Sequence, residues 1–274
     1  MSIRYIKKGI GLTESSIDNT KTNKIVETIL SEVKQKGDEA VRELSKKFDD
    51  WNPDSFRLTE KQILDIIAVV PEETINDIKW AQSQVRRFAQ IQRSSIQDIE
   101  IETLPGVVLG HKNIPVNTVG CYIPGGRYPI LASAQMSILT AKVAGVKKVI
   151  ACTPPDPRTK MPSVTTVAAM YFAGADEIYI LGGVQALAAL AYGCVGMPPV
   201  DMIVGPGNQY VAEAKRQLFG LVGLVLLAGP TGVWSFAEVT SEVELVVSAL
   251  FGQAGGGGEC AGMVGAVWGG VAGR

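Results

Sequence analysis

The stretch from Val119 to Ala144 constrains the fold of this chain more than any other. An apolar segment ends in Pro124-Gly125-Gly126, and a long run rich in Ala, Leu and Met follows. This order predicts a strand, a tight turn and a helix, the first half of a βαβ unit. The pattern returns twice, where apolar segments run into Gly182-Gly183-Val184-Gln185 and into Gly205-Pro206-Gly207-Asn208.

Strands and helices alternate from Thr118 onward, which predicts an α/β domain with a Rossmann-like, doubly wound parallel sheet. We expect strands at Thr118–Ile123, Lys148–Cys152, Glu177–Leu181, Met202–Val204 and Leu224–Leu227, with helices at Ser133–Ala144, Ser163–Phe172, Ala186–Tyr192 and Tyr210–Phe219. Because parallel strands end along one edge, the three glycine loops should meet there, at the edge where ligands usually bind.

Two interpretations of these glycine loops stay open. Glycine lets backbone N–H groups approach a phosphate, and the helix that follows favours negative charge at its N-terminus, so the loops favour a nucleotide-type ligand. Glycine after a strand also serves ordinary turns, and none of the three loops is a strict G-x-G-x-x-G. Plain turn chemistry therefore explains the pattern equally well.

A helical region precedes the sheet. Apolar residues recur at helical spacing over Thr22–Phe48, and we expect Gly37-Asp38 to divide this run, with Asp38 as the N-cap of the second helix. Thr59 with Gln62 has the pattern of a capping box that opens a short helix, and Pro71 begins another.

A β-hairpin is predicted between the helical region and the sheet. Ile99–Leu104 alternates in polarity, Pro105-Gly106 makes a turn, and Val107–Leu109 returns. His111 follows directly and is the single histidine of the chain, so it cannot build a multi-histidine metal site.

Composition narrows the class of protein and its location. A net charge of −1 and a pI near 6.0 disfavour nucleic acid as a partner. No apolar run reaches the roughly 18 residues that span a bilayer, so we expect no membrane segment. The N-terminus lacks the apolar core of a signal peptide, and the four cysteines include no C-x-x-C pair. We therefore expect a cytoplasmic protein whose Cys121 and Cys152 are buried free thiols.

The chain after Gln253 departs from everything before it. Glycine is dense there, and neither a helical nor a strand period is visible. Because glycine carries a high entropy cost on ordering, we expect a flexible or poorly folded end. An alternative is that this tail is not the natural continuation of the gene.

Five blocks, taken together, resemble the histidinol dehydrogenase family. They are Val119–Gly126, Ala144–Val149, Leu181–Ala186, Val204–Asn208 and Leu226–Thr231, in order and at family-like spacing. The likeness covers most of residues 1–253. The segments Gly125–Pro129 and Ala132–Met136 look most like the branch that includes sulfopropanediol 3-dehydrogenase.

The resemblance implies a zinc-dependent, NAD-linked oxidoreductase that takes a small primary alcohol through an aldehyde to a carboxylate, as a domain-swapped homodimer. By position, Tyr122, Gln185 and Asn208 match residues that contact NAD in this family. Thr231 matches a substrate-contacting hydroxyl, and Gln253 matches a ligand shared by zinc and substrate. For Gln185 and Asn208 the alternative role is helix N-capping.

The departures from the family pattern are equally informative. Gly255 and Gly256 stand where the family has a glutamate and a zinc-binding histidine, and Gly232 replaces a glutamate after Thr231. The catalytic Glu-His pair and the remaining zinc ligands of the family are expected beyond residue 274. We therefore assign no catalytic residue and expect this chain not to hold zinc tightly, since zinc needs three or four ligands. His111 lies in the wrong block to serve as the base.

These observations predict an N-terminal portion of such an enzyme, acting on L-histidinol or on a sulfonated diol. The alternative is a non-catalytic dinucleotide-binding or assembly module, or an inactive fragment. We expect residues 118–231 to form the NAD-side domain. Residues 1–117, with the hairpin, and residues 232–274, with the glycine-rich tail, should belong to a first, incomplete α/β domain.

Overall fold

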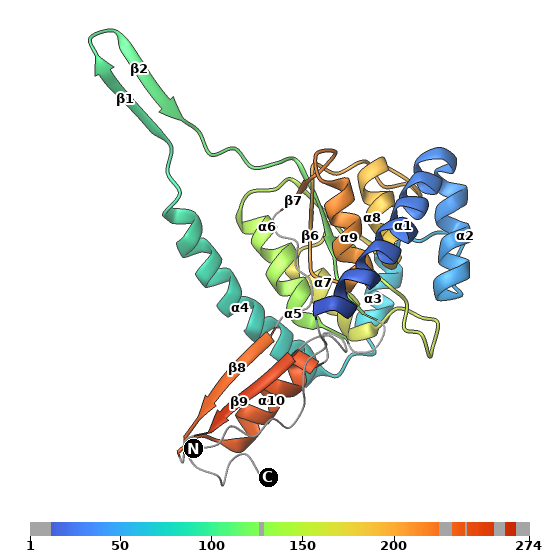
Figure 1. Cartoon of the computed structure of the whole chain (residues 1–274). Helices are drawn as coiled ribbons and strands as arrows, with labels where there is room; N and C mark the ends of the chain where they lie inside the picture. The colour runs from blue at the N-terminus through green and yellow to red at the C-terminus, as the bar shows by residue number, and fades with distance from the viewer. Residues whose placement is uncertain (1–11, 126–128, 225–231, 239, 255–260, 267–274) are drawn as a thin grey trace.

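The protein is built around a five-stranded parallel sheet (Figure 1). The structure is a computed structural model, and it describes residues 12–125, 129–224, 232–238, 240–254 and 261–266. The sheet has the order β5-β4-β3-β6-β7, and every pair is parallel, which confirms the predicted fold class. Its strands are β3 (Thr118–Tyr122), β4 (Lys148–Thr153), β5 (Glu177–Ile180), β6 (Met202–Val204) and β7 (Gly223–Leu224).

The strand order reverses between β3 and β6. The chain passes from β3 to β4 and β5 on one side, and then returns to the other side of β3 to form β6 and β7. Cys121 of β3 is paired with Val204 of β6 at the last registered position. This reversal is a topological switch point, and the crevice beyond it is the usual binding place in open α/β sheets.

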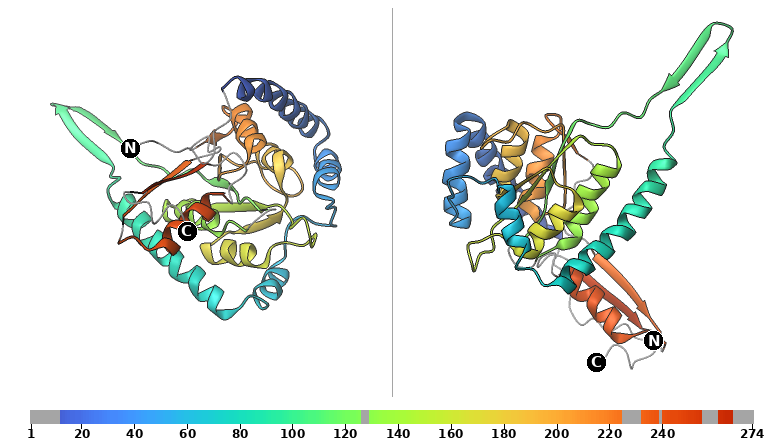
Figure 2. Two further views of the ribbon diagram at one scale, coloured as in Figure 1. Left: turned by 60° about the horizontal axis from the view of Figure 1, so that its bottom comes forward. Right: turned by 180° about the vertical axis from the view of Figure 1, so that it is seen from behind.

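Helices cover both faces of the sheet, as the end-on view in Figure 2 shows. Side chains of α1 (Leu12–Lys36), α2 (Asp38–Asp49), α8 (Gly183–Tyr192) and α9 (Gln209–Leu218) form one core. The other core contains α3 (Glu60–Ile67), α4 (Glu72–Ser94), α5 (Leu131–Ala134), the π-helical turn Gln135–Leu139, α6 (Thr140–Val143) and α7 (Val164–Ala173). Among the described helices, none is long and apolar enough to cross a membrane.

The inner positions of β3, β4 and β5 are buried because both faces of the sheet are covered. Successive side chains of a strand point to opposite faces. In β4, Val149 and Ala151 join one core, whereas Ile150 and Cys152 join the other. Cys121 of β3 and Cys152 are fully buried free thiols, as predicted.

The outer edge of β5 is covered by a short antiparallel contact. The Leu58 N–H donates to Ile178 O (2.9 Å), and the Ile180 N–H donates to Phe56 O (2.8 Å). Phe56 is itself fully buried, so its side chain anchors this segment. Covering the edge removes exposed backbone groups that could otherwise pair with another chain.

The helical region largely follows the sequence pattern, with one correction. Gly37, at φ +58°, is the N-cap of α2, and Asp38 is the first helical residue rather than the cap. The Asp38 carboxylate instead accepts the Val195 N–H at 2.6 Å, so a tertiary contact takes the place of the local cap. The capping box of Thr59 and Gln62 is present at the start of α3.

The predicted hairpin is present and stands away from the body of the protein (Figure 1). β1 (Ile99–Leu104) pairs with β2 (Val107–His111) in antiparallel fashion at the end of α4. Every residue of both strands is exposed.

A second, small parallel unit follows the main sheet. β8 (Gly232–Ala237), α10 (Val243–Ala254) and β9 (Ala261–Ala266) form a βαβ unit whose strands pair over six positions. The expectation of a poorly folded end is therefore wrong for residues 261–266. Pairing with β8 satisfies the backbone despite the glycines, and Gly265 leaves room for the Phe236 ring, which would lie 3.0 Å from an added Cβ. Residues 255–260 and 267–274 lie outside the described residues.

Candidate functional site at the carboxyl edge of the sheet

The loops that follow β3, β4, β5 and β6 all lie at the carboxyl edge of the sheet, because the strands are parallel. Close contacts join three of these loops. An added Cβ on Gly182 would lie 2.4 Å from Pro154 Cβ, and one on Gly125 would lie 3.3 Å from Thr153 Oγ1. Glycine at these positions allows the loops to pack against one another. Of the predicted loop residues, Gly126 lies outside the described residues.

The ends of β3 and β6 touch at the switch point. Gly205 has φ +113°, and an added Cβ there would lie 2.0 Å from the carbonyl oxygen of Tyr122. No side chain fits at this position, and an L-residue would also be strained by the positive φ. The contact holds the two loops beside the crevice close together.

Tyr122 links β3 to the start of α8. Its side chain is buried, and its hydroxyl accepts the Gly183 N–H at 3.2 Å. Burial raises the pKa of Tyr122 to about 12, so the side chain is a neutral phenol at physiological pH.

Gln185 joins the same buried polar cluster. Its side chain is 2% exposed, and Nε2 donates to Asp49 Oδ2 at 3.1 Å. Asp49 ends α2, and burial raises the pKa of its carboxyl group. The N-cap of α8 is Gly182, so Gln185 does not cap this helix. The structure thus brings Tyr122 and Gln185 together around Gly183, with Asp49 as a partner that the sequence analysis did not identify.

Asn208 caps α9. Its Oδ1 accepts the N–H groups of Tyr210 and Val211, each at 3.1 Å. The capping role considered from the sequence is therefore present for this residue. Its position after β6 also places it on the opposite side of the switch point from the loop after β3.

Lys215 is a buried cation close to the same crevice. It is 1% exposed, and its Nζ donates to Gly205 O at 2.9 Å. Burial lowers the pKa of its ammonium group. The sequence contained a signal for it, since Lys215 interrupts the apolar stripe formed by Val211, Ala214 and Leu218 at helical spacing.

A cavity of about 570 Å³ opens over the carboxyl ends of β3 and β4. Its apolar wall consists of Ile66, Pro129, Pro154, Met161, Pro162 and Val164, and its remaining lining of Gly125, Thr153, Asp156, Arg158, Thr159 and Ser163. Tyr122, Gln185 and Asn208 lie outside this lining. The glycine-loop pattern of the sequence does not point to this cavity, because the loop after β4 contains no glycine.

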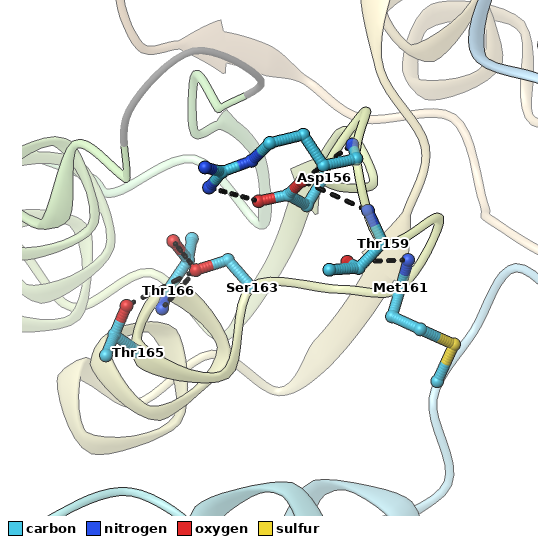
Figure 3. Close-up of polar contacts among 7 residues, drawn as sticks. Asp156, Thr159, Met161, Ser163, Thr165 and Thr166 are labelled. Carbon is cyan, nitrogen blue, oxygen red and sulfur yellow. Dashed lines mark hydrogen bonds and ion pairs between the residues drawn. The ribbon is translucent and has the colours of Figure 1, made fainter.

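Asp156 organises the loop between β4 and α7 (Figure 3). Its Oδ1 accepts the N–H groups of Arg158 (2.8 Å) and Thr159 (3.3 Å). These hydrogen bonds lower the pKa of Asp156, so it is a carboxylate at neutral pH. Nη2 of Arg158 lies 3.5 Å from Asp156 Oδ2, and Ser163 then caps α7 through the Thr166 N–H.

Of the two residues predicted to contact substrate or metal, only Gln253 is among the described residues. Gln253 lies in α10 and is half-buried, whereas Thr231 lies outside the described residues. Within the described ranges, no group of three or more His, Cys, Asp and Glu side chains could hold a metal ion. Gln253 alone supplies a neutral amide oxygen, which does not fit a zinc site.

Comparisons with known proteins agree with this architecture. A histidinol dehydrogenase homolog from Shouchella clausii is 57% identical over 251 residues, which are 92% of this chain and 59% of that protein. Sulfopropanediol 3-dehydrogenase from Ruegeria pomeroyi is 43% identical over 254 residues, 93% of this chain and 58% of that protein. The crystal structure of histidinol dehydrogenase from Elizabethkingia anophelis has a TM-score of 0.79 at 30% identity, over 98% of this chain and 59% of that one.

The chain thus spans less than two thirds of the length of these relatives. Residues 12–264 match the family model described as histidinol dehydrogenase. The chain therefore belongs to the histidinol dehydrogenase family.

Proposed function

We propose that this chain provides the NAD-binding side of an NAD-linked, zinc-dependent oxidoreductase that converts a small primary alcohol to a carboxylate through an aldehyde. Family membership supports the oxidoreductase class. The observation that carries the NAD proposal is the switch point between β3 and β6, with Tyr122 on one side and Asn208 on the other.

The residues at this edge suit a dinucleotide. α8 and α9 both begin there, and helix N-termini favour a negatively charged group such as a pyrophosphate. Tyr122 is a neutral phenol, and the amides of Gln185 and Asn208 add hydrogen-bonding capacity without charge. NAD bound there would supply the acceptor for a hydride from the alcohol carbon.

Zinc dependence is proposed for the whole enzyme and not for this chain alone. The described residues do not by themselves fit a zinc site. His111 lies on the exposed hairpin, which extends away from the sheet (Figure 1). Thr231 and Gln253 stay the proposed substrate contacts, and Gln253 stays the proposed metal contact. The division into a domain of residues 118–231 and a first domain from the flanking segments also stays a prediction.

Two alcohols are candidates for the substrate. Relatives are named both for histidinol, as in the histidinol dehydrogenase of Methanosarcina barkeri at 36% identity, and for sulfopropanediol, at 43% identity. We favour the sulfonated diol because the relative named for sulfopropanediol has the higher sequence identity of these two. The segments Gly125–Pro129 and Ala132–Met136 also resemble that branch in sequence. A second candidate function is a dinucleotide-binding module without turnover. Two observations favour it: the residues at the carboxyl edge suit NAD, and the described residues do not suit zinc.

Calorimetric titration with NAD tests the proposal. A few hydrogen bonds of about 0.5–1.5 kcal/mol each must offset the ordering costs of binding, so we expect a dissociation constant nearer millimolar than micromolar. Gln185→Ala should weaken binding by about 5- to 10-fold, the loss of one such bond. Asn208→Ser should also weaken it, since serine keeps the helix cap but lacks the amide.

Gln92→Ala, on the exposed part of α4, is the control and should bind NAD like the wild type. If NAD binds and neither Gln185→Ala nor Asn208→Ser weakens it, the assignment of these residues is wrong. If no heat of binding appears at saturating millimolar NAD, the chain is not a dinucleotide-binding protein. Assays with histidinol and with the sulfonated diol separate the module from the enzyme, because only the enzyme produces NADH.

The exposed hairpin supports a homodimer. Its side chains Ile99, Ile101, Leu104, Val107, Val108 and Leu109 are between 44% and 66% exposed. An isolated two-stranded hairpin is marginal in water, so apolar side chains on both of its strands call for a partner. In this proposal a second copy of the chain covers them.

A further inference from the structure

The carboxylate of Asp49 reaches the amide of Gln185 from a distant part of the chain. Asp49 is the last residue of α2, and α2 packs against α8, which carries Gln185. Oδ2 of Asp49 accepts a hydrogen bond from Gln185 Nε2 at 3.1 Å, across 136 residues of sequence. The packing of the two helices therefore places a charged group beside an amide of the proposed NAD site.

We infer that Asp49 is a positioning residue of this site: its carboxylate holds the Gln185 amide in one orientation, with Oε1 as the acceptor offered to the ligand, and loss of its charge weakens the binding of NAD. The inference rests on the NAD binding proposed above. It adds the residue that sets the direction of the hydrogen bond, and it assigns Gln185 to a donor group of the ligand, a hydroxyl or an amide N–H.

The hydrogen-bonding chemistry of a carboxylate fixes the orientation of the amide. An ionised carboxylate can only accept, whereas the glutamine amide has a donor end, Nε2, and an acceptor end, Oε1. Nε2 must therefore face Asp49. Oε1 then lies beside Gly183, where an added Cβ would be 2.7 Å from it. Gly183 begins α8, and the positive end of a helix favours an oxygen there over an NH₂ group.

Protonation of Asp49 removes this constraint. A neutral carboxyl group can donate a hydrogen bond, so the Gln185 amide can turn over and accept it through Oε1. The NH₂ group would then lie beside Gly183, whose own N–H already donates to the Tyr122 hydroxyl at 3.2 Å. The acceptor offered to the ligand would be lost, and a donor would take its place.

The groups around Asp49 decide where it titrates. Burial is the main cause of its raised pKa, while the Lys160 ammonium and the hydrogen bond from Gln185 act in the opposite direction. Lys160 comes from the loop after β4. Its Nζ donates to the carbonyl oxygen of Asp49 at 3.3 Å and lies 3.7 Å from Asp50 Oδ2. From β3 the neighbouring group is Tyr122, which is a neutral phenol.

The charge of Asp49 does not stabilise the fold. Because burial raises its pKa, the ionised form is less favourable in the folded protein than in the unfolded chain. The free energy of unfolding therefore falls as the pH rises from the ordinary pKa through the raised one. A purely structural role predicts no effect of this charge on ligand binding, whereas a positioning role predicts a loss of affinity without a loss of stability.

Asp49→Asn tests the orientation. Asparagine has nearly the same shape, but it carries both a donor and an acceptor and can pair with either orientation of the Gln185 amide. We expect NAD to bind about 5- to 10-fold more weakly at about pH 8. The midpoint of urea denaturation should be no lower than that of the wild type, because a costly charge is removed.

Asp50→Asn is the matched control. It removes the next carboxylate of the chain, whose side chain is 80% exposed and whose partner is Lys160 rather than Gln185. Asp50 has φ +50°, a conformation that asparagine also adopts readily. This variant should keep the wild-type affinity for NAD.

The pH dependence of binding gives a sharper test. The wild-type affinity for NAD should fall as the pH drops from about 8 to about 4.5, through the raised pKa of Asp49, and should approach that of Asp49→Asn. Effects of other groups, such as His111, remain in Asp49→Asn and are removed by the comparison. Lys160→Gln should move the fall to higher pH, because the Lys160 charge holds the pKa of Asp49 down.

The Gln185 amide itself reports the orientation without a ligand. Its side-chain signal in ¹⁵N–¹H spectra, identified by its absence from Gln185→Ala, should move over the same pH range in the wild type and in Asp50→Asn, but not in Asp49→Asn. A signal that does not move in the wild type would overturn the inference. Ligand-observed NMR gives the affinities for NAD.

The outcomes separate this inference from the proposed function. If Gln185→Ala weakens NAD binding but Asp49→Asn binds NAD like the wild type at every pH, the inference alone is overturned. If the wild type does not bind NAD, the proposed function fails and the inference fails with it. If Asp49→Asn loses stability together with affinity, the folded wild type and Lys160→Gln decide: equal pH profiles for these two proteins would overturn the inference.

Discussion

Tyr122, Gln185 and Lys215 reach the carboxyl edge from three different elements, and the structure fixes each of them through a hydrogen bond to a neighbour. Tyr122 accepts from a backbone N–H and, as a neutral phenol, keeps its own hydrogen for donation. Gln185 donates one amide hydrogen to Asp49, so its second amide hydrogen and its oxygen can bind other partners. Tyr122 and Gln185 therefore offer oriented, neutral hydrogen-bonding groups, beside the amine of Lys215.

Lys215 makes a pH-dependent contribution to stability. Its pKa is lowered in the folded state by burial, so the unfolded chain binds the extra proton between the lowered value and the ordinary 10.5. The free energy of unfolding should rise with pH across this window, because the cost of burying the charge disappears. Urea denaturation of the wild type and of Lys215→Met at neutral and alkaline pH measures this.

In that series, the wild type should gain stability relative to Lys215→Met as the pH rises toward 10.5. A difference between the two proteins that stays constant with pH would contradict the assignment. Val211→Ala, in the same apolar stripe, is the control for a change in packing without a titrating group.

At this scale the sequence predicted positions better than partners. Asn208 stands at the end of the loop after β6, as the pattern predicted, whereas Gln185, expected in a loop, lies in the first turn of α8. Asp49, which binds Gln185, is 136 residues away in the chain, and no local pattern carries such a contact. The sequence pattern did not predict Asp156 and its cavity, because glycine was the signal for these loops, whereas Asp156 shapes its loop through side-chain hydrogen bonds.

At the scale of elements, the strand boundaries agree with the sequence to within a residue for β3, β4, β5 and β6. Buried parallel strands are short apolar runs bounded by turns, and such runs leave little freedom in where they end. β9 was not predicted, because a strand of Gly, Ala, Met and Val has no alternation, and its structure depends on β8.

The contact between β3 and β6 gives a sharp test of the switch point. Gly205→Ala should destabilise the protein by about 3 kcal/mol or more, because it combines a positive φ with a clash against the backbone of Tyr122. Gly196→Ala is the control, since Gly196 also has a positive φ, +84°, but nothing lies within 4 Å of its added Cβ. It should cost only about 1–2 kcal/mol of backbone strain.

Chemical denaturation of both glycine variants gives the two values. Equal losses of unfolding free energy for Gly205→Ala and Gly196→Ala would mean that the close approach of the two strand ends adds nothing to the cost of the substitution. NAD titration of the variants that fold would then show whether the contact shapes the site.

On the scale of the whole molecule, apolar surface is unevenly distributed. The main sheet is covered on both faces, whereas the hairpin and the unit of β8, α10 and β9 extend from it (Figure 2). The alternation of Ile99–Leu104 predicted a strand, but it could not predict that both faces of the hairpin would be exposed. Burial of a surface depends on its partner, which a single strand pattern does not encode.

The double variant Ile101→Ser, Leu109→Ser tests the proposed homodimer. These residues are paired across the hairpin and are 59% and 56% exposed, so their loss should hardly change the stability of a single copy. Sedimentation velocity should show a dimer for the wild type and weaker association for the variant. Glu100→Ser, on the same strand, is the control; a wild type that is monomeric at all concentrations would refute the proposal.

Trp51 packs against both cores, and its indole Nε1 donates to Ile180 O at 2.9 Å. Trp80 and Trp234 are 69% and 65% exposed, and Trp268 lies outside the described residues. The fluorescence of Trp51 should therefore be blue-shifted and protected from iodide, which quenches exposed indoles first. With Trp80, Trp234 and Trp268 replaced, the emission of Trp51 reports the melting of both faces of the sheet, and a single transition in it would show that they unfold together.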